Sequence, residues 1–302
     1  MQSSISQDTW KLNIENEVTE ILKYCLYSDY VYIDYEQKEI PLNPMIVAPP
    51  GTGKTAMIDQ FSENDGVMVF GKITEHSLLD KYLEDLKSGQ KRLLIPDMVN
   101  PANMKTETVN ALITFLNAYI SWEGVRTISH YGGHFPIALR SPLRGSLMTS
   151  MATNDFQRMF KSLAATGFAS RLVIVGYFYK RDTVREIMLN LAYHKHKWMG
   201  IYLTLPSERK HIEAHGDYIS RLIPQALKLG EVVPGYDIRA LQQMALMCKA
   251  RALMNGRLSV NGEDIDRVLY LFKTYVLKVP NLDDETKMRM SEAYKKEQRS
   301  KE

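Results

Sequence analysis

A glycine-rich stretch, A-P-P-G-T-G-K-T at residues 48–55, constrains the fold of this chain more than any other feature. The short apolar run Met45-Ile46-Val47 leads into it, and a helix can begin at Lys54. A strand, a glycine-rich turn and a helix in this order form a phosphate-binding loop, because backbone N–H groups and the positive end of the helix face the phosphates. The context therefore predicts an α/β fold with a parallel sheet flanked by helices.

The residue types of the loop follow from this chemistry. Gly51 and Gly53 let the backbone turn inward around the phosphates. Lys54 is expected to reach the β- and γ-phosphates, and the Thr55 hydroxyl to coordinate magnesium. The loop thus predicts ATP and Mg²⁺ as ligands, with a binding set of Pro50, Gly51, Thr52, Gly53, Lys54, Thr55 and Ala56. Ala48 replaces the usual first glycine, and its methyl group is tolerable if the residue keeps a negative φ.

An acidic residue, Asp97, follows the apolar run Leu93-Leu94-Ile95, where a second strand is expected to end beside the loop. A carboxylate there would hold magnesium through water. Most such ATPases have a glutamate next, which polarises the attacking water, whereas this chain has Met98. Either Asp97 is the magnesium acid and the glutamate is missing, or Asp97 takes the place of the glutamate and Pro96 that of the first acid. Both alignments predict slow hydrolysis or a base from elsewhere. Two candidate bases are Glu107 and Glu123.

Together with the loop, two downstream segments resemble those of AAA+ ATPases. The stretch S-L-M-T-S-M-A-T-N at 146–154 is similar to the sensor-1 strand, and the resemblance implies that Asn154 lies within reach of the γ-phosphate or the attacking water. The stretch G-F-A-S-R-L-V-I-V at 167–175 is similar to the segment that carries an arginine finger. This likeness implies that Arg171 reaches the ATP site of a neighbouring subunit in a homo-oligomer, most commonly a hexameric ring.

Residues 235–268 resemble the helical lid of the same family, and Arg239 aligns with its sensor-2 arginine. The resemblance therefore implies a P-loop NTPase of the AAA+ type, with a helical lid domain after the parallel sheet. Its order of features is most similar to the branch of minichromosome maintenance helicases and MoxR-type ATPases, in which a β-hairpin precedes the sensor-1 strand. The implied catalytic set is Asp97, Asn154, Arg171 and Arg239, with Thr55 and Asp97 as the metal ligands.

From Gly124 the apolar spacing changes to two, and Gly132-Gly133 is typical of a hairpin turn. Residues 124–154 contain no acid. Arginine and aromatic side chains there suit a nucleic-acid backbone and its bases. They would equally suit an unfolded polypeptide, and a third interpretation is a hairpin used only for subunit contacts. The candidate contact residues are Arg126, His130, Tyr131, His134 and Arg140, with Arg144 nearby.

Strand patterns stop near residue 205, where we place the main domain boundary. The expected parts are an N-terminal helix/strand linker (1–40), an α/β nucleotide-binding core (41–205), a helical lid domain (206–280) and a charged tail (281–302). Helical spacing continues through 219–229, 237–254 and 264–276, and Pro224 is expected to kink or shorten the first of these helices.

Composition indicates the cellular compartment but does not identify the substrate. The net charge of +3 over 302 residues neither requires nor excludes nucleic acid. Cys25 and Cys248 lie far apart and form no disulfide framework, which favours a reducing, cytoplasmic location. The first residues lack the pattern of a secretory signal, and no apolar run approaches the length of a membrane span, so no membrane partner is expected.

These patterns predict an oligomeric ATPase that couples ATP binding and hydrolysis to remodelling or translocation of nucleic acid, as a helicase-like motor or a loader. Two alternatives remain open. One is a MoxR-like protein remodeller, in which the hairpin engages a protein client. The other is a structural switch that ATP assembles, with little hydrolysis because of Met98.

Overall fold

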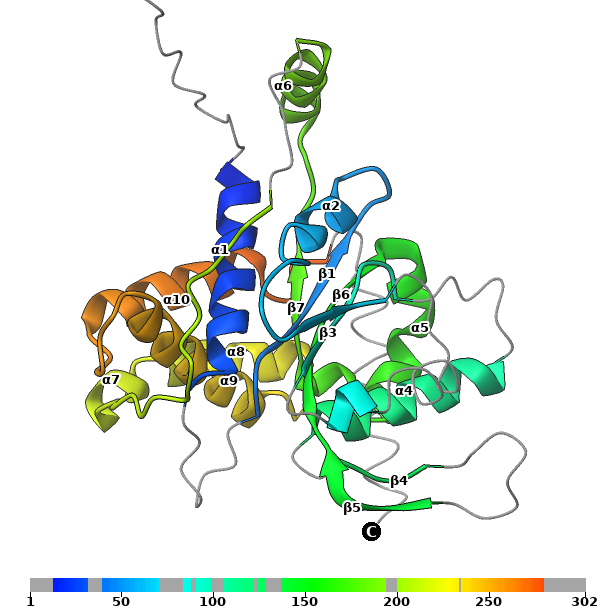
Figure 1. The fold of residues 1–302 in the computed structure, drawn as a ribbon. Coiled ribbons are helices and arrows are strands. Elements are labelled where there is room, and N and C mark those ends of the chain that lie inside the picture. Colours follow the sequence, from blue (N-terminus) through cyan, green and yellow to red (C-terminus); the bar gives the residue numbers. More distant parts are fainter. Residues whose placement is uncertain are drawn as a thin grey trace, which may run out of the picture.

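A central β-sheet separates two groups of helices (Figure 1). The computed structural model describes residues 13–31, 40–70, 84–87, 91–98, 106–121, 124–128, 137–193, 200–233 and 235–279. Within these ranges, no helix is both long and apolar enough to cross a membrane. Strands and helices alternate in the first two thirds of the chain, and the last third is helical, which agrees with the predicted α/β fold.

The sheet has five strands in the order β2-β3-β6-β1-β7, and every neighbouring pair is parallel. Its strands are β1 (Asn43–Ala48), β2 (Val67–Val69), β3 (Lys91–Ile95), β6 (Gly145–Ala152) and β7 (Leu172–Gly176). Ala48 of β1 lies beside Ala152 of β6, and Ile95 of β3 lies beside Thr149. The loop after β1 and the acidic turn after β3 therefore flank the end of β6.

Side chains of the strands alternate between two buried cores. Ile46 and Leu94 pack in the core that contains α1 (Asn13–Ser28) and α2 (Lys54–Asp59). Val47 and Leu93 pack in the core on the opposite face, which contains α4 (Thr106–Ile120) and α5 (Thr153–Ala165). Because helices cover both faces, β1 and β7 are buried along their whole length instead of alternating between buried and exposed residues.

The C-terminal helices form one group with α1 (Figure 1). They are α7 (Gly216–Ser220), α8 (Ile223–Val232), α9 (Asp237–Met254) and α10 (Gly262–Tyr275). Pro224 stands in the first turn of α8, which confirms that it shortens the helix predicted over 219–229; the first two of these residues belong to α7. The helix predicted over 264–276 is present as α10, which begins two residues earlier with a capping box between Asn261 and Asp264.

The N-terminal helix α1, expected as part of a linker, packs into the helical group. Arg267 of α10 lies 2.5 Å from Glu20 and 3.4 Å from Glu17 of α1. Tyr275 also donates a hydrogen bond to Glu17. The first and last described helices therefore share a polar contact as well as a core.

Sequence patterns missed two helices. Helix α5 begins directly after β6 and buries Phe156, Phe160 and Leu163 at helical spacing. A short 3₁₀ turn, η2 (Ala169–Arg171), then leads into β7. Helix α6 (Arg181–Ala192) follows β7, has no buried residue and stands clear of the body of the molecule (Figure 1).

The predicted hairpin is present as an antiparallel pair, β4 (Val125–Ile128) and β5 (Ile137–Leu143). It forms a two-stranded sheet of its own. Figure 1 places it at the end of the molecule opposite α2 and α6. The turn with Gly132-Gly133 lies outside the described residues.

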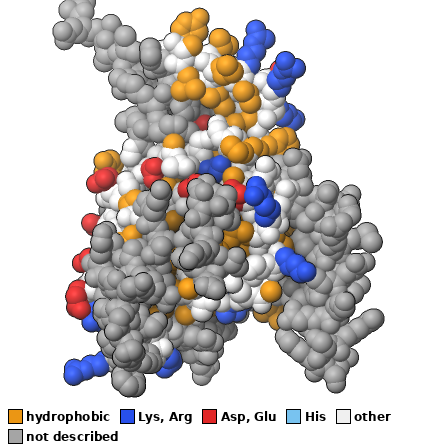
Figure 2. Space-filling view, turned by 90° about the vertical axis from the view of Figure 1, so that its right-hand side faces the viewer, with side chains coloured by type: hydrophobic (Ala, Val, Ile, Leu, Met, Phe, Trp, Pro, Cys, Tyr) orange, Lys and Arg blue, Asp and Glu red, His pale blue; other side chains and the backbone are white. Residues whose placement is uncertain are grey.

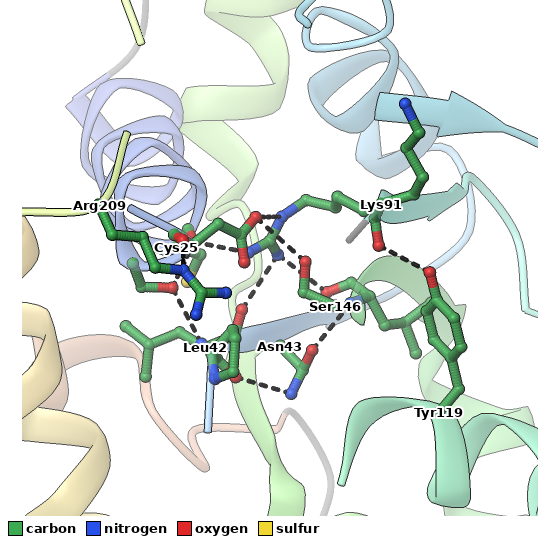
Figure 3. Close-up of polar contacts among 12 residues, drawn as sticks. Cys25, Leu42, Asn43, Lys91, Tyr119, Ser146 and Arg209 are labelled. Carbon is green, nitrogen blue, oxygen red and sulfur yellow. Dashed lines mark hydrogen bonds and ion pairs between the residues drawn. The ribbon is translucent and has the colours of Figure 1, made fainter. Parts of the chain in front are cut away.

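A buried arginine, Arg92 of β3, joins four elements at the amino end of the sheet (Figure 3). Its guanidinium pairs with Asp29 at 2.9 Å, just beyond α1. It also donates to three backbone oxygens, those of Cys25 at 2.6 Å, Leu42 at 3.0 Å and Leu147 at 3.1 Å. The oxygen of Cys25 belongs to the last turn of α1, where helix carbonyls lack intrahelical donors and favour a cation.

Replacing Arg92 with Met is expected to lower the free energy of unfolding by about 3–5 kcal/mol, because Asp29 would lose its buried partner. Urea unfolding would measure the loss. The matched control is Arg209→Ala, which removes an exposed arginine that donates to the backbone oxygen of Asp29 at 3.1 Å. This control is expected to cost less than about 1 kcal/mol. Equal effects of the two substitutions would contradict a central role for Arg92.

Candidate nucleotide-binding site

The glycine-rich loop has the backbone that phosphate binding requires. Gly51 and Gly53 have φ values of 76° and 79°, which confirms the predicted need for glycine at both positions. A methyl group added at Gly51 would meet nothing within 4 Å, so the constraint there is the backbone conformation. Ala48 is a buried residue of β1, and it is not among the residues of positive φ. The substituted first glycine therefore costs this loop no strain.

Lys54 and Thr52 support the loop from within. The ammonium group of Lys54 donates to the oxygen of Pro49 at 3.1 Å, and the Thr52 hydroxyl donates to the same oxygen at 2.8 Å. Partial burial lowers the pKa of Lys54, while the carboxylates of Asp97 and Asp155 act to raise it. Both acids are thus close enough to act on the lysine that is expected to hold phosphate. Thr55 is exposed in the first turn of α2.

Tyr177, just beyond β7, holds the loop from the neighbouring strand. Its buried hydroxyl donates to the oxygen of Thr52 at 2.9 Å. Its ring lies 5.5 Å from that of Tyr179, whose hydroxyl donates to Glu15 of α1 at 3.3 Å. The sequence offers no pattern for this contact, because the two residues are 125 positions apart and meet only through strand pairing.

A pocket of about 470 Å³ opens beside the loop. One wall is the loop itself over residues 49–53, and Glu15 and Tyr179 also line the pocket. The opposite wall is an apolar stripe of α6 together with Phe178, made of Val184, Ile187, Met188 and Leu191. Figure 2 shows hydrophobic side chains gathered at this end of the molecule beside Lys and Arg. A phosphate loop facing an apolar wall suits a ligand with a charged and an aromatic part.

Asp97 lies two residues beyond β3 and is exposed. Its carboxylate interacts electrostatically with Lys54 and Asp155. Partial burial raises the pKa of Asp97, Lys54 opposes this rise and Asp155 adds to it. Met98 is 1% exposed and packs in the core beneath α4 and α5. Its backbone N–H donates to Ser150 of β6 at 2.8 Å. The side chain at position 98 therefore turns away from the site, and no base can act from there in this arrangement.

The polar end predicted for the sensor-1 strand forms the first turn of α5. Strand β6 ends at Ala152, so Thr153, Asn154 and Asp155 are helical. Asn154 is exposed. Thr153 is buried, and its hydroxyl has no partner in the described part of the chain. Sequence analysis missed Asp155, although an acid in the first turn of a helix that follows a buried strand is itself a recognisable pattern.

Arg171 and Arg239 lie together, away from the loop. Both line a small pocket beside Pro41 and Gln243. Leu172, directly after Arg171, pairs with Asn43 at the amino end of β1, whereas the loop follows the carboxyl end. Five residues of strand separate the two ends by roughly 17 Å. The guanidinium of Arg171 donates to the oxygen of Gly167 at 2.7 Å. The predicted catalytic residues thus divide between opposite ends of the sheet.

The hairpin residues can be placed only in part. Arg126 of β4 and Arg140 of β5 are exposed, and Arg144 is half-buried. The remaining predicted contacts, His130, Tyr131 and His134, lie outside the described residues, as do Glu123 and the side chain of Glu107.

Replacing Tyr177 with Phe is expected to raise the Kd for Mg-ATP by about three- to tenfold, because the loop loses one buried hydrogen bond at Thr52. Isothermal titration calorimetry would measure the change. Tyr202→Phe, at an exposed tyrosine, is the control and should leave the Kd unchanged. An unaltered Kd in the Tyr177 variant would show that the loop keeps its shape without this contact.

No protein-family model and no curated protein matches this chain. The case for its function therefore depends on the geometry of the site. That geometry has two parts: a glycine loop facing Asp97 and Asp155 at one end of the sheet, and two arginines at the other.

Proposed function

We propose that this chain is an ATPase of the AAA+ type that works as an oligomer. The observation that carries the proposal is the loop after β1, with two glycines of positive φ and Lys54 within the electrostatic reach of Asp97. Strand β6 lies between the strands that lead to these two residues, which is the order that the resemblance implies. The pocket beside the loop offers an apolar wall for a nucleobase.

Magnesium fits the residues present. The Thr55 hydroxyl at the start of α2 and the Asp97 carboxylate are both exposed at this end of the sheet. No group of three or more His, Cys, Asp or Glu residues that could hold a metal occurs in the described ranges, so phosphate oxygens would complete the coordination. Bound magnesium supplies positive charge that offsets the charge of the phosphates. Lys54 contributes a second cation from the chain itself.

The position of Arg171 supports an oligomer in which two different surfaces meet, Arg171 of one subunit and the loop of the next. Arg171 and Arg239 lie at the end of the sheet opposite the loop of their own chain. A neighbouring copy could bring this pair to the loop, where guanidinium donors stabilise charge that develops on the transferred phosphoryl group. We propose a homo-oligomer, as in a hexameric ring, in which Arg171 acts on the site of the next subunit.

Lys54→Ala is expected to abolish Mg-ATP binding and turnover, because the loop loses its cation for the β- and γ-phosphates. Arg171→Ala should spare nucleotide binding and lower turnover by about 10³-fold or more, the effect typical of an arginine finger. Calorimetry and phosphate release would measure the two quantities. Mixing the two variants should restore part of the turnover, since an interface in which a Lys54→Ala subunit presents its Arg171 to the loop of an Arg171→Ala subunit combines an intact loop with an intact arginine.

Three results would count against the proposal. Turnover that survives Lys54→Ala would place ATP hydrolysis elsewhere. Mixed variants without any recovery would argue against Arg171 acting across a subunit boundary. Wild-type protein that binds Mg-ATP and assembles without turnover would instead support the ATP-assembled switch.

The hairpin supports nucleic acid as the substrate of the motor, because Arg126 and Arg140 are exposed on β4 and β5. The double variant Arg126→Ala/Arg140→Ala is expected to weaken ATP-dependent binding of a single-stranded oligonucleotide. It should also make the slope of the logarithm of the binding constant against the logarithm of salt concentration less steep, by about one unit for each phosphate that the variant no longer neutralises. Fluorescence anisotropy at several salt concentrations would measure both.

The matched control is Lys228→Ala/Lys273→Ala, which removes two exposed cations from the helical group. It should leave oligonucleotide binding unchanged. Wild-type protein that binds neither DNA nor RNA at low salt would exclude nucleic acid and favour the protein remodeller.

A further inference from the structure

We propose that Asp155 is the carboxylate that positions the attacking water and accepts its proton. The inference rests on the proposed ATPase function and names the residue that replaces the glutamate absent at position 98. It follows from the placement of the first turn of α5 between the loop and Asp97.

Position 98 cannot supply the base. Met98 is buried, and its backbone is tied to Ser150 of β6. The Ser150 hydroxyl donates to the oxygen of Pro96 at 2.5 Å, so both sides of Asp97 are held against β6. A carboxylate at position 98 would point into the same core. The base must therefore come from another element at this edge of the sheet.

The strand register brings α5 to that edge. Ala48, the last residue of β1, lies beside Ala152, the last residue of β6. Neighbouring strands are about 4.8 Å apart, so the loop and the first turn of α5 begin side by side. On the other flank of β6, Asp97 follows two residues after Ile95, the partner of Thr149. Asp155 therefore stands above the middle strand of the three.

The electrostatic interactions of Asp155 also indicate that it lies close to the loop and to Asp97. The Asp155 carboxylate acts electrostatically on both Lys54 and Asp97. Its side chain is 27% exposed, and its partner Arg158, one turn along α5, lies 3.6 Å away and is 68% exposed. The carboxylate is accessible to water while close to the loop.

Neighbouring residues in the turn cannot do the same chemistry. Asn154 is exposed, but an amide does not accept a proton at neutral pH. Thr153 is 4% exposed, and its hydroxyl lacks a partner in the described part of the chain. A buried hydroxyl of this kind favours a polar ligand, such as the attacking water or a phosphate oxygen, at the same turn. Asp155 is the member of the turn that can serve as a base.

The step balances as a hydrolysis. The oxygen of water forms a bond to the γ-phosphorus of ATP while the bond from that phosphorus to the bridging oxygen breaks. The electron pair of the broken bond stays on the oxygen of the leaving ADP. The proton lost by water goes to the Asp155 carboxylate, and the products are ADP and inorganic phosphate.

Asp155→Asn tests this role, because it keeps the size of the side chain and removes the base. Steady-state phosphate release by the full chain is expected to fall at least about 100-fold, the range that general-base catalysis contributes. The Kd for Mg-ATP should stay within about twofold, since Lys54 and the loop are unchanged. Asp155→Glu, which keeps the carboxylate, should turn over ATP at a rate between those of the wild type and the Asn variant.

Asp266→Asn is the matched control, because Asp266 also pairs with an exposed arginine, Arg221, but lies in α10. It should leave turnover unchanged. Turnover of Asp155→Asn within about threefold of the wild type would overturn the role of Asp155 while leaving the ATPase intact. A loss of Mg-ATP binding in that variant would overturn it too, and would assign Asp155 to binding. A wild type that binds Mg-ATP without turnover would overturn the ATPase itself.

Discussion

The buried ion pair between Arg92 and Asp29 is the contact on which the arrangement of this fold depends. A guanidinium inside a protein needs hydrogen-bond acceptors and a counter-charge, and besides Asp29 Arg92 finds acceptors on α1, β6 and the segment before β1. The contact fixes how the amino ends of β1, β3 and β6 align. Because these strands are parallel, the same alignment decides which residues meet at their carboxyl ends, 15–20 Å away by roughly 3.3 Å per residue.

The loop is connected to the helical group through α1. Glu15, in the first turn of this helix, lines the pocket beside the loop and accepts from Tyr179. Further along the same helix, Glu17 and Glu20 pair with Arg267 of α10. A rigid helix thus touches the pocket at one end and the C-terminal helices along its length. A ligand that displaced Glu15 would act directly on the element that holds those helices.

Local patterns predicted the strand over residues 45–47, the loop after it, the helix start at Lys54 and the bounds of α9, because each depends on residues close in sequence. Contacts that depend on strand order could not be predicted in the same way. Arg92 looked like an ordinary residue before a strand, and Tyr177 had no visible link to Thr52. The sequence pattern at 146–154 predicts a strand that ends in Thr153 and Asn154, although the apolar spacing from Phe156 to Leu163 requires a helix there. Because no helix was expected there, Asp155 was not considered as a site residue.

The separation of Arg171 from the loop has a consequence for symmetry. If Arg171 of one copy docks on the loop of the next, the two surfaces in contact are different, and the interface is heterologous. Such an interface repeats the same rotation and rise at every step. Whether the assembly closes into a ring or grows into a helical filament then depends on the angle that one subunit makes with the next. A small change of packing at the Arg171–Arg239 pocket would change that angle, and with it the number of copies per turn.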